Sequence, residues 1–316
     1  MKMRKIVCSF MISVVCFMTA ISGVSATSYD TSKINAAYSK VVEYYKNNNN
    51  LNNADKILAV ESLGLEAESN QFDTSSADLS STSLSKKIVT EVLLGVDPTE
   101  DKKTLESQID ENGNVEGSWG ASSDVWTLYA LYVTSSEKTN LIANKLNDEL
   151  AASSVCGYEW GGTYYADYDT TGWVIEGLAV VNKEKYATTI NKAIDYIKNN
   201  TTMTTTGWVT ADNVDTQSQV LEGMFAYDTN ALLNDSYTVH PVDCLLNTQL
   251  SDGSFPSGYN AEYTTAEVAK TLGTYKNGSV IIKAKKAYDK MMNPEQPDNT
   301  KPAQPTDTKK DSQSTN

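Results

Sequence analysis

The sequence predicts an all-α protein: an (α/α)6 toroid of six inner and six outer helices, built from helical-hairpin repeats. Three observations predict this fold. Apolar helix ends recur with a spacing that settles near 47 residues, polar helix-start residues recur at one phase, and apolar helices alternate with amphipathic ones. No segment shows the strict alternation that is typical of strands. Closure follows from the number of helices, and an open superhelix would have the same periodicity.

Both ends of the chain lie outside the predicted repeats. Residues 1–26 combine a basic start, an apolar run and a small-residue site at Val24-Ser25-Ala26, which is typical of a signal peptide. The apolar run is nearly long enough for a membrane anchor, but polar Thr27-Ser28 follow it directly, so we expect cleavage. Residues 293–316 are rich in Pro, Thr and Lys and predict a disordered tail. We therefore expect one domain over 27–292, in a secreted or cell-surface protein.

Charge excludes several classes of partner. The formal charge of the whole chain is −14, and loss of the signal, with its three basic residues, leaves 23 basic against 40 acidic residues, or about −17. Arg4 is the only arginine. Nucleic acids and anionic membranes require a cationic surface, and diphosphates are commonly held by arginine. We expect a small-molecule ligand or a protein partner, no nucleic acid, and membrane contact only through the signal; the oligomeric state stays open.

The inner helices are located by a repeated apolar residue near the end of each. These residues are spaced by 31, 37, 47, 46 and 48 positions: Leu63, Leu94, Leu131, Leu178, Met224 and Leu272. Four helix starts, at 122–126, 169–173, 215–219 and 263–267, share one phase and open with residue types such as Asp, Ser and Thr that cap free N–H groups. A glycine–aromatic turn precedes each start. Its aromatic residue is expected to wedge between repeats: Trp119, Trp160, Trp208 and Phe255.

The outer helices are predicted from amphipathic stripes. One stripe, for example, places Ile190, Ala193, Ile194 and Ile197 on a single helical face. The six predicted outer helices are Tyr29–Asn48, Glu100–Ile109, Glu137–Ala152, Tyr186–Asn200, Ser236–Gln249 and Val280–Met292. In contrast, the segment 174–181 is apolar most of the way round, as expected for a helix between a core and a lumen.

The turn at 249–255, Gln-Leu-Ser-Asp-Gly-Ser-Phe, resembles the Gln-x-x-Asp-Gly-Ser-Trp element of squalene-cyclase and prenyltransferase repeats. Segments 53–64, 84–95 and 112–133 resemble the same repeats in secreted bacterial proteins of the terpenoid cyclase and protein prenyltransferase superfamily. The resemblance covers residues 30–292 and implies the α/α toroid that terpene cyclases, prenyltransferase β subunits and cobalamin carriers share. It does not choose among their functions.

A catalytic role is one candidate for Asp167 and Asp169. Class II terpene cyclases use an Asp-x-Asp-Asp motif, which Asp167-Tyr168-Asp169-Thr170 matches except at its last position. An acid of this kind must be neutral when it donates its proton, which burial or a neighbouring carboxyl favours. The simpler interpretation makes Asp169 a helix N-cap, because the neighbouring repeats place Ser122 and Asp215 at the same position.

Ligand-binding candidates lie at the mouth that the inner-helix N-termini would form. Trp126 and Trp173 are one turn inside neighbouring inner helices, 47 residues apart, and Tyr168, Asp215 and Gln217 accompany them. Free N–H groups and a partial positive charge favour a polar ligand group there, while the local aspartates compete for those N–H groups. Paired carboxylates among these aspartates would also suit glycan cleavage.

A metal site or cofactor is not expected. His240 is the only histidine, so a multi-histidine metal site within the chain is excluded. Asp243 and Cys244 follow His240 and would complete a prenyltransferase-like zinc set, but they fall on a predicted outer helix away from the mouth. Cys156 and Cys244 are the cysteines left after the signal, and a bridge between them is possible.

These observations favour a secreted toroid that binds a small apolar or amphipathic ligand, or a protein partner, at its mouth. The alternative is an enzyme with paired carboxylates, either terpene-cyclase-like or glycan-cleaving. The binding hypothesis requires a lumen lined by aromatic and apolar side chains. A lumen filled by side chains would instead favour a protein-interaction scaffold.

Overall fold

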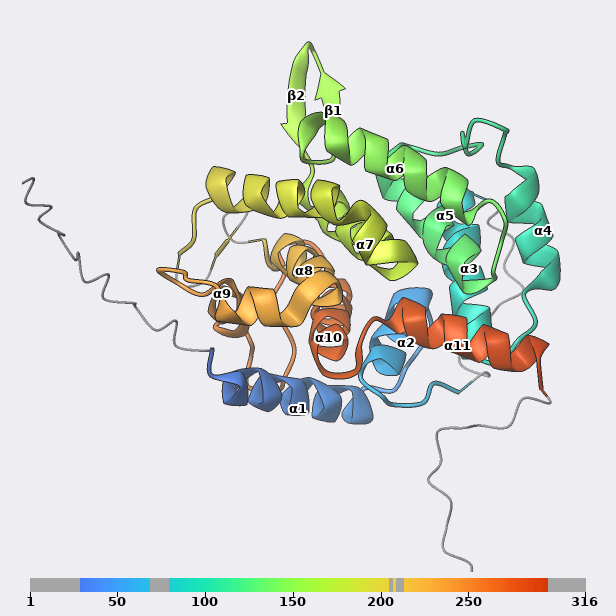
Figure 1. Cartoon of the computed structure of the whole chain (residues 1–316). Coiled ribbons are helices and arrows are strands. Elements are labelled where there is room, and N and C mark those ends of the chain that lie inside the picture. The colour runs from blue at the N-terminus through green and yellow to red at the C-terminus, as the bar shows by residue number, and fades with distance from the viewer. Residues whose placement is uncertain (1–28, 69–79, 205–206, 209–212, 295–316) are drawn as a thin grey trace, which may run out of the picture.

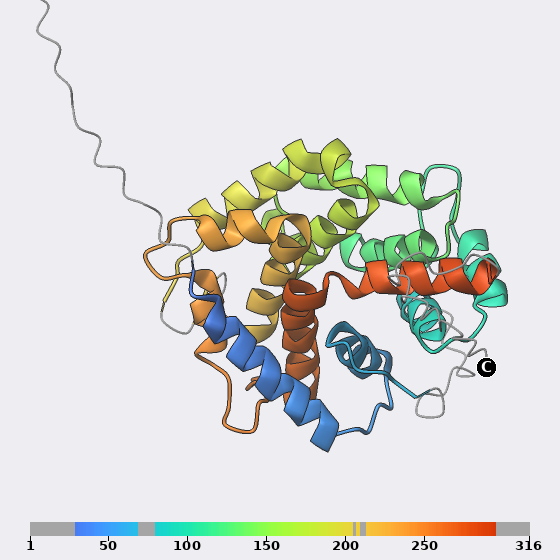
Figure 2. The ribbon, with the colours of Figure 1, turned by 60° about the horizontal axis from the view of Figure 1, so that its bottom comes forward.

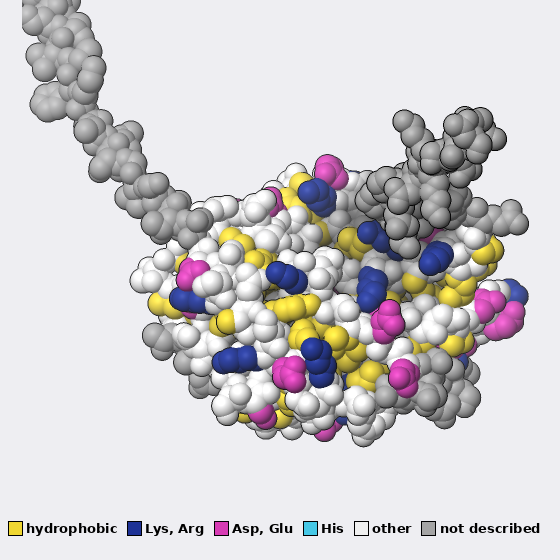
Figure 3. Space-filling model, turned by 90° about the horizontal axis from the view of Figure 1, so that it is seen from below, with side chains coloured by type: hydrophobic (Ala, Val, Ile, Leu, Met, Phe, Trp, Pro, Cys, Tyr) yellow, Lys and Arg dark blue, Asp and Glu magenta, His cyan; other side chains and the backbone are white. Residues whose placement is uncertain are grey.

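The computed structural model describes residues 29–68, 80–204, 207–208 and 213–294. The predicted signal peptide and the predicted tail lie outside these residues. The described chain is mostly helical, as predicted, with one two-stranded hairpin (Figure 1). No described helix is both long and apolar enough to cross a membrane. Basic, acidic and apolar side chains are interspersed on the face shown in Figure 3.

Six helical segments are buried over most of their surface, and we call them the inner helices. They are α2 (Ala54–Ser62), α3 (Ser81–Leu93), α5 (Ala121–Val133), the first part of α7 (Tyr168–Asn200), the first part of α8 (Val214–Asn234) and α10 (Ala261–Asn277). The helices α7 and α8 each contain a kink, at Asn182 and Asp228, where the backbone leaves the helical region. Each kink therefore divides an inner segment from an outer one.

The remaining helices bury one side. They are α1 (Thr31–Asn47), α4 (Thr99–Ser107), α6 (Thr139–Ser153), the parts of α7 and α8 after their kinks, α9 (Pro241–Leu246) and α11 (Val280–Met292). The predicted outer helix Ser236–Gln249 was too long. Pro241 occupies the first turn of α9, where its missing N–H costs nothing, so the helix begins there.

The inner helices contact one another in chain order, and the last contacts the first. Contacts join α2 to α3, α3 to α5, α5 to α7, α7 to α8, α8 to α10, and α10 to α2 (Figure 2). Helix α11 runs from the end of α10 towards α3 and also contacts α2 and α5. Ser279, just before α11, donates to Glu176 of α7, and Lys283 pairs with Glu61 of α2. Helix α11 therefore covers the C-terminal parts of several inner helices.

The aromatic residues of the glycine–aromatic turns differ in their burial. Trp208 and Phe255 are fully buried, as wedges between repeats must be, whereas Trp119 is 90 % exposed and the prediction for it was wrong. The side chain of Trp160 is outside what the structure describes. In the 249–255 turn, Gln249 donates to the backbone oxygen of Ala37, so this turn docks on α1.

A β-hairpin stands between α6 and α7, where no strand was predicted. Strands β1 (Gly157–Trp160) and β2 (Thr163–Ala166) pair antiparallel and project from the helical body (Figure 1). The connecting residues Gly161 and Gly162 both have positive φ, which is typical of a tight two-residue turn. The strands are too short for a convincing alternation in the sequence.

Candidate functional site

The N-termini of the inner helices meet at one end of the molecule. Helices α7, α8 and α10 are capped by Asp167, Asn213 and Asn260, and α5 begins after Gly120 without a side-chain cap. The prediction that Asp169 is an N-cap was therefore wrong, because Asp167 accepts the N–H of Thr170 instead, at 3.0 Å. The carboxyls of Asp169 and Asp215 are thus available for other contacts.

Asp169 and Asp215 lie beside each other without a basic partner. Asp169 is hydrogen-bonded to the side chain of Thr216, and Asp215 to that of Thr264. Burial raises the pKa of Asp169 to about 6, and the nearby Asp167 and Asp215 add to that rise. Burial also raises the pKa of Asp215. Within the described part of the chain, neither carboxyl forms an ion pair.

Two tryptophans line the same end. The ring centroids of Trp126 and Trp173 are 5.9 Å apart, in an edge-to-face arrangement. The Lys86 ammonium lies 4.5 Å from the centroid of Trp126 and pairs with Asp55 at 2.9 Å. The indole N–H of Trp173 is buried and meets no hydrogen-bond acceptor among the described residues. This end, the mouth, therefore combines a half-buried indole ring over a buried one with two carboxyls that lack a basic partner; we define it by Trp126, Trp173, Asp169 and Asp215.

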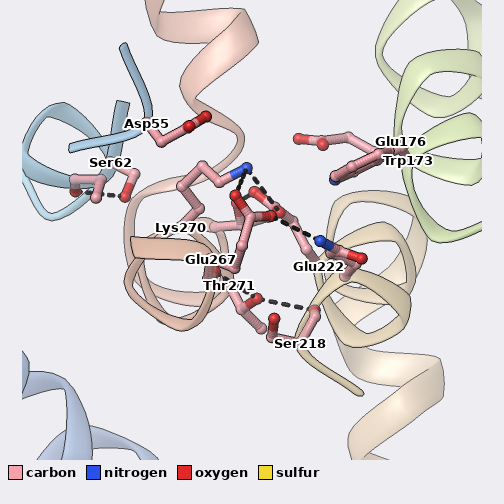
Figure 4. Close-up of polar contacts among 12 residues, drawn as sticks. Asp55, Ser62, Trp173, Glu176, Ser218, Glu222, Glu267, Lys270 and Thr271 are labelled. Atoms are coloured by element: carbon pink, nitrogen blue, oxygen red, sulfur yellow. Dashed lines mark hydrogen bonds and ion pairs between the residues drawn. The ribbon is translucent and has the colours of Figure 1, made fainter. Parts of the chain in front are cut away.

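Directly inside the mouth lies a group of charged side chains that we call the interior cluster: Glu176, Glu222, Glu267 and Lys270. The Lys270 ammonium lies 3.0 Å from Glu267 Oε1 and 3.9 Å from Glu222 Oε2 (Figure 4). Glu176 approaches from α7 beside Trp173, and its carboxylate accepts from Tyr129 at 2.9 Å. All four side chains are buried. The interior is thus filled with polar groups, not lined by the apolar surface that the binding hypothesis required.

The electrostatics of the interior cluster are unbalanced, with three carboxyls and one ammonium. Burial would lower the pKa of Lys270, but Glu267 and Glu222 together raise it, so this lysine stays charged. Burial raises the pKa of Glu222 well above its ordinary value, and it raises that of Glu176 as well. The low-dielectric interior therefore favours the protonated form of Glu222 and Glu176.

Sequence reasoning missed the interior cluster, although the repeat contains a signal for it. Two residues before the repeated apolar position, five of the six inner helices carry a polar side chain: Glu61, Tyr129, Glu176, Glu222 and Lys270. All five are buried. A charged residue recurring at one phase of otherwise apolar helices indicates a shared polar interior.

The remaining predicted site residues, Asp167, Tyr168 and Gln217, lie at the start of α7 and in α8 and have other contacts. Asp167 is a cap that also accepts from the Thr170 hydroxyl at 2.7 Å. Tyr168 is half-buried against the core at the first position of α7. Gln217 is fully buried in α8.

The zinc-like set is not assembled. His240 caps α9 through Nδ1, Asp243 accepts from Tyr29 and Lys33, and the Cys244 thiol donates to the backbone oxygen of Thr204. No group of three or more metal-binding side chains occurs in the described ranges. Cys156 and Cys244 are buried and free, so the possible bridge does not form.

Replacing Asp169 by asparagine is expected to raise the free energy of unfolding at pH 7 by about 1–2 kcal/mol. At pH 4 the same replacement should change the free energy of unfolding little. The pKa in the folded state, about 6, exceeds the ordinary value of 3.8, so the folded protein binds more protons between these values. The free energy of unfolding of the parent protein therefore falls as the pH rises through this window. Urea unfolding at both pH values measures the difference, and an equal effect at both would contradict the raised pKa.

No protein-family model, curated protein or solved structure matches this chain.

Proposed function

We propose that this chain is a secreted (α/α)6 toroid that binds an amphipathic ligand with a basic group at its mouth. The sequential contacts of the inner helices, together with the contact between α10 and α2, support ring closure over an open superhelix. The alternation of inner and outer segments supports the resemblance to terpenoid cyclase and prenyltransferase repeats. The signal-like segment 1–26 favours secretion.

One observation supports the choice of ligand: the carboxyls of Asp169 and Asp215 are partly buried at the mouth and lack a basic partner among the described residues. An incoming ammonium would supply the missing charge, and its binding would gain from the partly desolvated setting. Trp173 is half-buried and offers part of its ring to an apolar portion, while the buried Trp126 supports that ring edge-to-face.

A purely apolar ligand is less favoured than the sequence alone suggested. The buried charges of Glu222, Glu267 and Lys270 fill the interior below the mouth, so an apolar chain has no apolar lumen to enter. The ligand would therefore remain at the mouth. The filled interior also favours a protein partner, and a basic segment of such a partner has the same chemistry and is the alternative occupant.

Native mass spectrometry of the secreted protein would test for a co-purifying small molecule. Calorimetric titration with an alkylammonium and the alkyl sulfate of equal chain length, below their micelle-forming concentrations, tests the charge preference. We expect the ammonium to bind and the sulfate not to bind.

Asp215→Asn is expected to weaken ammonium binding at least fivefold, corresponding to about 1 kcal/mol. Lowering the pH from 7.5 to 5 should weaken binding to the parent protein as well, because protonation of Asp169 near pH 6 removes its negative charge. Asp252→Asn, at an exposed carboxyl of the 249–255 turn, is the matched control and should bind normally. Equal binding of the two amphiphiles would refute the proposed ligand class.

An enzyme is the second candidate, because Asp169 is a carboxyl poised to donate a proton near pH 6. Asp215 and Glu267 would supply the neighbouring carboxylates. If Asp169 is a general acid, Asp169→Asn abolishes turnover of a linear terpenoid or a glycan while the protein remains folded. If it only binds, no turnover is found in either protein.

A further inference from the structure

A second concave site lies at the rim, beside the mouth. We call it the rim pocket. It has a volume of about 280 Å3 and lies between the end of α1 and the starts of α2 and α10. Its lining consists of Tyr44, Tyr45, the four asparagines at 47–50, Lys56 and Glu262. This volume is slightly below that of ordinary ligand pockets, which suits a single ring-sized unit.

The rim pocket is polar and electrically balanced. Lys56 and Glu262 pair at 2.8 Å across the starts of α2 and α10, so their charges compensate each other. Asn48 donates from Nδ2 to the backbone oxygen of Tyr44, which ends α1 and fixes the asparagine segment. Tyr44 is half-buried, edge-on to the buried Tyr45, at 5.3 Å between centroids. An aromatic ring beside amide groups and one ion pair forms a site for a neutral, hydroxyl-rich ring.

Exposed aromatic side chains lie on other segments of the chain that lead into inner helices. In the described chain, the exposed aromatic residues are confined to the segments that lead directly into α5, α7 and α10: Trp119, Tyr158, Tyr164, Tyr165 and Tyr259. Tyr259 is 91 % exposed and precedes Glu262 of the rim pocket by three residues. Tyr158 and Tyr165 are cross-strand neighbours, stacked at 5.5 Å between centroids. Trp119 and Tyr259 are single rings on separate segments, and such rings suit successive units of a chain better than one continuous apolar interface.

We propose that the rim pocket binds one unit of a neutral glycan chain, with Tyr44 against the sugar ring and Tyr259 against an adjacent unit. The amides of residues 47–50 and the Lys56–Glu262 pair would bind the sugar hydroxyls. An anionic polymer does not suit this site, because Lys56 is already paired and the chain after the signal carries about −17 with no arginine. The site is separate from Asp169 and Asp215, so this proposal goes beyond ligand binding at the mouth.

Affinity gel electrophoresis with a neutral β-glucan, a xylan, a mannan, and anionic polygalacturonate and dextran sulfate tests the proposal. We expect at least one neutral polymer to retard the protein and the anionic ones to have no effect. Tyr259→Ala and Tyr44→Ala should each weaken the retardation at least tenfold. Tyr259 is fully exposed, so its loss leaves the fold intact even if Tyr44→Ala is unstable. Glu262→Gln, which leaves Lys56 without its carboxylate partner, should also weaken the retardation by the neutral polymer.

Met292→Ala, at an exposed position on α11, is the matched control and should be retarded like the parent protein. Asp215→Asn should also be retarded normally, which separates this proposal from ligand binding at the mouth. The absence of retardation by every neutral polymer would overturn the proposal. Unchanged retardation of Tyr259→Ala and Glu262→Gln, or retardation by the anionic polymers alone, would overturn it equally.

Discussion

Replacement of Lys270 by methionine is expected to lower the free energy of unfolding by about 3–5 kcal/mol. Lys270 is the ammonium of the interior cluster, and its side chain is 3 % exposed between Glu222 and Glu267. Methionine preserves most of the volume but leaves these carboxyls without a cation in a medium that solvates charge poorly. Urea unfolding followed by circular dichroism at pH 7 measures the loss.

The loss should shrink as the pH is lowered from 7 to 5. Loss of the ammonium removes the interaction that favours the charged form of Glu222, so the pKa of Glu222 rises further in the variant and its folded state binds more protons than the unfolded chain as the pH falls. Stability of the variant therefore rises relative to the parent protein as the carboxyls become neutral. A loss independent of pH would indicate a packing defect instead of unpaired charge.

Two other variants make the comparison specific. Lys285→Met removes an ammonium of the pair with Asp289 on the surface of α11, and it should cost less than about 0.5 kcal/mol. Glu222→Gln should cost less than Lys270→Met, because burial already raises the pKa of Glu222 well above its ordinary value and the amide keeps the size and a hydrogen-bonding group. If Lys270→Met costs no more than Lys285→Met, the interior cluster does not hold the inner helices together.

The helical class was predictable because each amphipathic stripe is a local pattern. The stripe over 190–197 lies in the outer part of α7, and the predicted helix Val280–Met292 matches α11 at both ends. The N-cap of α7 was misplaced because Asp occurs at both 167 and 169. Only the backbone decides which carboxyl meets the N–H of Thr170.

The interior cluster could not be assembled from local patterns. Glutamates and lysines in a helix normally indicate a solvated face. Glu222 and Lys270 are 48 positions apart and meet only because α8 lies against α10. Trp126 and Trp173 lie on neighbouring inner helices at the spacing of the repeat, but the two lysines near Trp126, Lys86 and Lys270, come from α3 and α10.

Replacement of Gly172 by alanine is expected to lower the free energy of unfolding by about 3 kcal/mol, although alanine is the better helix former by about 1 kcal/mol. A Cβ atom at this position would lie 2.4 Å from the backbone oxygen of Gln219 in α8. Reciprocally, a Cβ atom on Gly223 would lie 2.3 Å from the backbone oxygen of Gly172. The backbones of α7 and α8 thus touch, and no side-chain rotation can relieve the overlap.

Gly177→Ala is the matched control on the same helix. Its Cβ atom would meet only the side chains of Leu128, Val125 and Tyr129, at 3.1–3.4 Å, and these can shift by a few tenths of an ångström. We expect Gly177→Ala to change the free energy of unfolding by less than about 1 kcal/mol, in either direction. Equal costs for the two variants would contradict the backbone contact. The same contact sets the spacing between Asp169 and Thr216, so Gly172→Ala should also weaken ammonium binding at the mouth, while Gly177→Ala should not.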